Sequence, residues 1–210
     1  MQLPPKENMT IAKKVILDLK GVLERNHKSK LGLALINLLA EAGREIDRIK
    51  NAEKDLVTFA LATRNIFEIY LIIRNISENE AALDCWYGQM HKDLVDVNSG
   101  LRKLATKKAI NIAELDALDD LYNQALDQSA FESKGQFNIK TIALKYDHGE
   151  DFDWLYKLTS KLIHPSSVKV NGFQFLGEAE QYLGALEHSC SYFCMKLEDY
   201  ALELMNGLEA

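Results

Sequence analysis

The sequence predicts an all-α protein, and three features of the chain point to this fold class. Pro4, Pro5 and Pro165 are its only prolines, so nothing between them breaks a helix in the way proline does. Apolar residues recur at intervals of three and four along most of the chain. No segment alternates strictly between apolar and polar residues, as a half-buried strand would. We therefore expect a single domain, residues 1–210, built as one bundle of about six to eight mostly antiparallel helices.

The first half of the chain predicts four helices. One covers about residues 10–26, and the next begins near Ser29, a residue type that caps helices. A third reaches Ile76 and is apolar nearly all round, so we expect it to be the buried centre of the bundle. Ser77-Glu-Asn-Glu80 has the spacing of a capping box and opens a fourth helix, which the turn residues Asn98-Ser-Gly100 end.

The second half of the chain predicts four more helices. Asn111 caps a fifth helix, and a short helix follows at about residues 139–146. Another covers about residues 152–163 and is ended by Pro165. The last runs from about residue 173 to residue 206.

Charge, cysteine content and hydropathy exclude several classes of protein. A formal net charge of −6 disfavours binding to phosphate backbones. Cys85, Cys190 and Cys194 are too few and too unevenly spaced for a disulfide framework, which indicates a reducing compartment. The longest apolar run, residues 31–40, is much shorter than the ~20 residues of a membrane crossing, and the first residues lack a signal core. We therefore expect a cytoplasmic protein without membrane contact.

No pattern in the sequence indicates a cofactor or a metal. Cys190 and Cys194 lie near His188, but small core residues explain them better than a zinc site does. The chain has no Gly-x-Gly-x-x-Gly and no P-loop sequence, so no nucleotide cradle is indicated. A dense basic strip at residues 102–108 is typical of a solvated helix face, with phosphate contact as the alternative.

Two polar clusters interrupt apolar helix faces. In the first, Arg64 and Glu68 are four residues apart on the third helix, on a face that also carries Leu61 and Leu71. Because burial of two charges is costly unless they pair, a structural ion pair is one interpretation. In the other interpretation, Arg64 presents its guanidinium to an anionic ligand or a phosphate.

The second cluster is a polar stripe on the helix at residues 152–163. Tyr156, Ser160 and His164 follow one another at intervals of four, which places them on successive turns of one helix face. In one interpretation, His164 caps the last carbonyls of the helix and bonds to Ser160 or Tyr156. In the other, His164 is a general acid or base that Tyr156 and Ser160 orient.

These residues carry a resemblance to known proteins. An Arg-x-x-x-Glu helix followed by a Tyr-x-x-x-Ser-x-x-x-His-Pro segment resembles a family of bacterial helical proteins of uncharacterised function, over about half the chain. More remotely, the arrangement is similar to the HEPN superfamily, small helical bundles that include metal-independent ribonucleases and abortive-infection toxins. HEPN active sites place an arginine a short interval before a histidine, whereas here Lys157 stands there before His164. The resemblance therefore implies that Arg64 acts from another helix.

The sequence leaves the function open between classes, including whether the protein is an enzyme. The first hypothesis is a non-enzymatic helical-bundle protein that binds a protein partner or forms a homodimer. The alternative is a divergent HEPN-type, metal-independent ribonuclease, a toxin or phage-defence effector in which His164 and Arg64 act on RNA. Glu68, Tyr156 and Ser160 complete that candidate site. A third hypothesis is a binder of small acidic ligands that uses Arg64.

Overall fold

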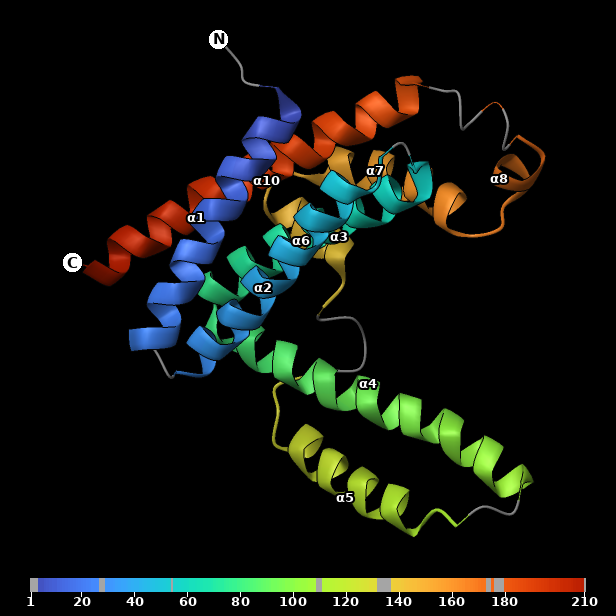
Figure 1. Ribbon diagram of the computed structural model, residues 1–210. Coiled ribbons are helices and arrows are strands. Elements are labelled where there is room, and N and C mark those ends of the chain that lie inside the picture. Colours follow the sequence, from blue (N-terminus) through green and yellow to red (C-terminus); the bar gives the residue numbers. More distant parts are fainter. Residues whose placement is uncertain are drawn as a thin grey trace. The chain divides into compact units, whose positions relative to one another are not determined.

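The fold is entirely helical in the part of the chain that the computed structural model describes, which comprises residues 4–26, 29–53, 55–108, 111–131, 137–172, 175 and 180–209. No strand occurs within these residues, so the prediction of an all-α protein is confirmed. Nine helices occur there, above the predicted six to eight (Figure 1). The unexpected one is α8 (Ser167–Asn171), a short helix that Ser166 caps by accepting a hydrogen bond from the Lys169 amide at 3.1 Å.

The chain divides into two compact units. One, which we call the core unit, consists of residues 1–74 and 142–210. The other, the hairpin unit, consists of residues 75–141. Compactness does not measure whether two units unfold together, so the single domain expected from the sequence stays a prediction.

The core unit is built around helices that bury long apolar stripes. Helix α1 packs against α2 and α10, and Figure 1 shows it lying across α10. Helix α3 leaves the unit after Arg74 and is buried along most of its length, as its all-round apolar pattern predicts. The helices that contribute to this unit are α1 (Pro5–Asn26), α2 (Lys30–Asn51), α3 (Leu56–Glu78), α6 (Ile139–Lys145), α7 (Gly149–Ile163), α8 and α10 (Glu180–Glu209).

Helix α3 also corrects an expectation about membranes. Among the described residues, it is the one helix long and apolar enough to cross a membrane, by length and composition only. The expectation that no segment reaches that length is therefore wrong. In the structure, 67% of the most apolar window of α3 is buried inside the protein. Its length and composition thus fit a core helix as well as a membrane span.

The hairpin unit contains α4 (Glu80–Lys107) and α5 (Ala113–Asp127), which run antiparallel and pack against each other (Figure 1). The expected capping box is wrong, because Ser77 lies inside α3 and Asn79 caps α4 by accepting from the Ala81 amide at 3.0 Å. The expected turn at Asn98-Ser-Gly100 is also wrong, since α4 continues through it. The side chain that would form the turn is engaged elsewhere: the Asn98 amide donates to Asp119 of α5 at 2.9 Å.

Ser29 and Pro165 mark helix ends as the sequence predicts, but Asn111 does not: Ile112 is the N-cap of α5, without a side-chain hydrogen bond. Ser29 caps α2, and α7 ends at Ile163, with His164 extended (φ −87°, ψ 157°) before Pro165. Helix α1 begins at Pro5, earlier than expected, because proline suits the first turn of a helix. The expected start of the last helix, residue 173, lies outside the described residues, and α10 is described from Glu180.

Candidate functional site

Three of the five candidate site residues form one network in the core unit. Helix α3 supplies Arg64 and Glu68, and α7 supplies Tyr156. The Arg64 Nε donates to Glu68 Oε1 at 2.8 Å, and the Tyr156 hydroxyl donates to the same oxygen. The Arg64 guanidinium carbon lies 4.0 Å from the centroid of the Tyr156 ring, within range of a cation–π contact. The Phe152 ring stacks on the Tyr156 ring, with 3.9 Å between the two centroids.

The environment of this network keeps the Tyr156 hydroxyl and the Arg64 guanidinium protonated. The Arg64 and Glu68 side chains are half-buried, at 27% and 25% exposure. Burial raises the pKa of Tyr156, and the hydrogen bond to Glu68 raises it further, so the phenol remains a donor. Burial lowers the pKa of Arg64, but the hydrogen bond to Glu68 and the interactions with Tyr156 and the Glu68 carboxylate leave that pKa above its ordinary value. The guanidinium is therefore charged and already engaged by two neighbours.

The other two candidate residues, Ser160 and His164, do not join this network. Ser160 is half-buried and His164 is exposed, and within the described residues neither side chain makes a hydrogen bond. His164 is eight residues beyond Tyr156, about 12 Å along a helix axis. The structure thus separates the imidazole from the Arg64 network.

The end of α7 is capped, but not by the histidine. The Ser166 hydroxyl donates to the Lys161 carbonyl at 2.6 Å, and the Lys169 ammonium donates to the Ile163 carbonyl at 3.4 Å. These two side chains perform the task that one interpretation of the sequence gave to His164.

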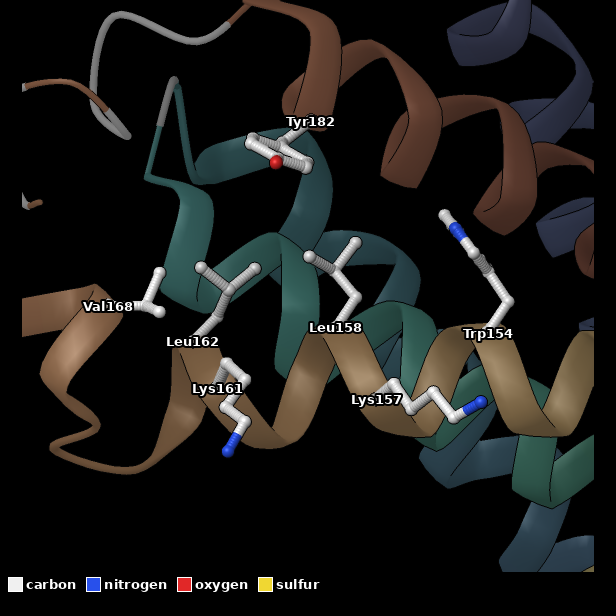
Figure 2. A pocket seen from close by; sticks show the side chains of 7 residues that line it. All are labelled: Trp154, Lys157, Leu158, Lys161, Leu162, Val168 and Tyr182. Carbon is white, nitrogen blue, oxygen red and sulfur yellow. The ribbon is translucent and has the colours of Figure 1, made fainter.

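An apolar groove lies beside the same helix and was not singled out from the sequence. Figure 2 shows Leu158 and Leu162 on the side of α7 that faces Tyr182 of α10. The groove has a volume of about 330 Å³, and the exposed Trp154 stands near its end. Its lining residues are Trp154, Lys157, Leu158, Lys161, Leu162, Val168 and Tyr182. The signal that could have revealed it is Trp154, a large aromatic residue next to the polar stripe of α7.

A buried carboxylate on α2 was also missed. The Glu45 side chain is 1% exposed, and its Oε1 accepts from Asn65 at 2.8 Å and from Arg48 at 3.0 Å. Its other oxygen, Oε2, has no hydrogen-bond partner among the described residues. Burial raises the pKa of Glu45, although the contacts with Asn65 and Arg48 oppose this. The sequence signal was its place on the apolar stripe of the second helix, between Ala42 and Ile49.

A buried histidine sits in an aromatic cage at the start of α7. His148 is 8% exposed, and its Nδ1 lies 2.7 Å from an Asp151 carboxylate oxygen. Nothing in the sequence singled out this histidine. Four aromatic rings have centroids 5.5 to 6.5 Å from the imidazole, namely those of Phe67, Tyr70, Tyr192 and Phe193.

The cysteines of α10 form a buried pair. The two sulfur atoms, Cys190 Sγ and Cys194 Sγ, lie 4.0 Å apart, in hydrogen-bond contact. The hydrogen bond to Cys190 raises the pKa of Cys194, and burial raises it further, so the thiol form is favoured. In the part of the chain that the structure describes, no three His, Cys, Asp or Glu side chains gather as metal ligands would.

No protein-family model, curated protein or solved structure matches this chain. The resemblance of the Tyr156-to-Pro165 segment to a bacterial helical family therefore stays a prediction, as does the remoter one to HEPN proteins.

Proposed function

We propose that this protein is a non-enzymatic helical-bundle protein that acts in the cytoplasm by binding another protein or a second copy of itself. One observation supports this most: large apolar side chains lie exposed on helices of both units, and on α4 they form a row. On α4, Val97 and Leu104 are 60% and 51% exposed, and beside α7, Val168 is 55% exposed. Gathered exposed apolar residues are typical of interaction surfaces, whereas scattered ones need no explanation.

The arrangement of the polar residues supports the same proposal. A general acid or base must lie within hydrogen-bond reach of the proton it moves, or one water away. His164 stands apart from the network in which Glu68 and Tyr156 already hold the Arg64 guanidinium. An ion pair within α3, to which Tyr156 of α7 adds a hydrogen bond and a ring contact, explains these contacts without catalysis.

The alternative is a divergent ribonuclease with an HEPN-like bundle that acts on RNA through His164 and Arg64. One observation favours it: the His164 imidazole is exposed at the end of the helix whose Tyr156 contacts Arg64. A histidine that is open to solvent can approach a large substrate.

The two functions are tested by induced expression in a bacterial host, with growth and total RNA integrity as readouts. Wild type is compared with His164→Ala, with Arg64→Ala, and with His188→Ala as a matched exposed histidine on α10. We expect intact RNA and equal growth for all four. RNA fragmentation that His164→Ala abolishes and His188→Ala retains would overturn the proposal and support the ribonuclease.

A further inference from the structure

An uninterrupted apolar row runs along the hairpin unit on α4. Five residues recur at intervals of four, three, four and three, which is the spacing of the apolar positions in a coiled coil. Leu94 is half-buried, whereas the others are 45% to 60% exposed. We call this row the α4 seam: Met90, Leu94, Val97, Leu101 and Leu104.

Helix α5 does not cover the seam, because it is held on a neighbouring face of α4. That face carries Asn98, which donates to Asp119 at 2.9 Å, and Arg102, which pairs with Asp116 at 2.7 Å and with Asp119. Ala105 continues that face and is buried. Helix α4 thus has one face covered by α5 and an apolar face, the α4 seam, left open. Such an open face can pack against a further helix.

The charges beside the seam select a second copy of the chain as that helix. With Leu94 and Leu101 at the first apolar position of each heptad, Asp93 and Lys107 both occupy the position just before it. Both are exposed, and within the described residues neither has an ion-pair partner.

An antiparallel copy would pair these charges. Packing Leu94 against Leu104 of the second copy also packs Leu101 against Val97 of the second copy. In that register, Asp93 lies opposite Lys107 of the second copy, and twofold symmetry repeats the pair. A parallel copy offers no such complement, because Asp93 would then lie beside the Asn98 side that α5 already occupies.

The same register gives a role to a glycine in the middle of α4. Gly100 would lie opposite Gly100 of the second copy, on the twofold axis. A Cβ added there would meet nothing within 4 Å in one copy, so the packing of the single chain does not require glycine. Glycine weakens a helix interior, but it lets two helices approach closely.

We propose that two copies of this chain associate through the α4 seam, with their α4 helices antiparallel and related by a twofold axis at Gly100. The proposal rests on the proposed function and names a second copy as the partner. The two hairpins then meet along about 26 Å of helix, the length from Met90 to Lys107.

The first test is the sedimentation of the full chain over roughly 1 to 200 µM, a range that covers micromolar dissociation constants. We expect wild type to form dimers, and Leu101→Glu to raise the dissociation constant about tenfold or more, because it places two charges in an apolar contact. Leu33→Glu is the matched control, since Leu33 on α2 is 50% exposed and Leu101 is 49% exposed. Circular dichroism shows whether each variant keeps its helices.

Charge reversal tests the direction and register. Asp93→Lys and Lys107→Asp should each weaken the dimer about tenfold, since each turns two attractive pairs into two repulsive ones. The double variant should recover wild-type association. A double variant as weak as the single ones would overturn this register.

Two further outcomes separate this inference from the proposed function. Dimers that survive Leu101→Glu would overturn the α4 seam but leave self-association standing through another surface. A wild type that stays monomeric over the whole range would overturn both the seam and self-association, while the RNA experiment still judges the non-enzymatic proposal.

Discussion

The two units of this protein are stabilised in different ways. The core unit buries large side chains completely, among them Phe59, Phe67 and Leu39. Helix α5 of the hairpin unit buries no residue at all. Among the described residues, the buried apolar side chains of the hairpin unit are mostly small: Ile76, Ala82, Leu83, Cys85 and Ala105.

This difference in buried side chains indicates how each unit is held together. Burial of apolar area stabilises the core unit, although some large apolar side chains, such as Leu33 and Val168, remain exposed on it. In the hairpin, Arg102 and Asn98 of α4 contact Asp116 and Asp119 of α5, so polar contacts take part in the pairing of the two helices. The apolar side chains of the α4 seam are not part of that pairing and remain on the surface of the hairpin unit.

The largest expected effect comes from truncating a buried aromatic residue of the core unit. Phe67→Ala should lower the free energy of unfolding by about 3–5 kcal/mol, because the ring is fully buried and its loss leaves a cavity. Its centroid lies 4.6 Å from that of Phe193, so a second ring loses its packing as well. Denaturant titration followed by circular dichroism measures the change.

The matched hairpin variant is Leu101→Ala, studied at a concentration low enough to keep the protein monomeric. Its effect should stay within about 0.5 kcal/mol, since a 49% exposed side chain gives up little buried area. A loss close to that of Phe67→Ala would show that the seam is already covered within one chain.

An effect between these two is expected from the polar contacts of the hairpin. Arg102→Ala should raise hydrogen exchange of the α5 amides about 5- to 30-fold, equivalent to about 1–2 kcal/mol of local stability. High salt should act in the same direction, because it screens the pair between Arg102 and Asp116. Lys103→Ala is the control, as an exposed cation one position away. Equal exchange in both variants would place the stability of the hairpin in its apolar contacts instead.

The same contrast explains which parts of the fold the sequence could predict. Periodicity and end signals work where burial follows the pattern of one helix, as for Ser29 at the start of α2 and Pro165 after α7. They fail at Asn98-Ser-Gly100, which has the composition of a turn. The Asn98 side chain bonds to Asp119, and no local pattern contains a partner so far along the chain.

In the candidate site, too, contacts within one helix could be predicted from the sequence and contacts between helices could not. Helical spacing was enough to place Arg64 beside Glu68, and their 2.8 Å contact depends only on α3. Spacing also aligned Tyr156 with His164 on α7. Spacing could not predict how α7 packs against α3, and it is this packing that brings the Tyr156 hydroxyl to Glu68. Such contacts between helices are set by packing, not by the period of either one.

The last prediction concerns Glu45, a buried carboxylate of the core unit that accepts hydrogen bonds from Asn65 and Arg48. Burial raises the pKa of Glu45 in the folded protein, so the folded state binds this proton more tightly than the unfolded chain does. Its contribution to stability is therefore present at low pH and is lost as the pH rises through the folded pKa.

Glu45→Gln removes this titration and keeps an oxygen that can accept from Asn65 and Arg48. We expect the stability of wild type minus that of the variant to fall by an amount on the order of 1 kcal/mol from about pH 4 to about pH 7. Urea titrations of both proteins at matched pH values measure this difference, and changes in all other carboxylates cancel. A difference that rises with pH would mean that the Arg48 charge and the Asn65 hydrogen bond outweigh burial. The pair of Glu45 and Arg48 would then stabilise the core unit, as the pair of Arg102 and Asp116 stabilises the hairpin. The two units would then differ less in how they are stabilised.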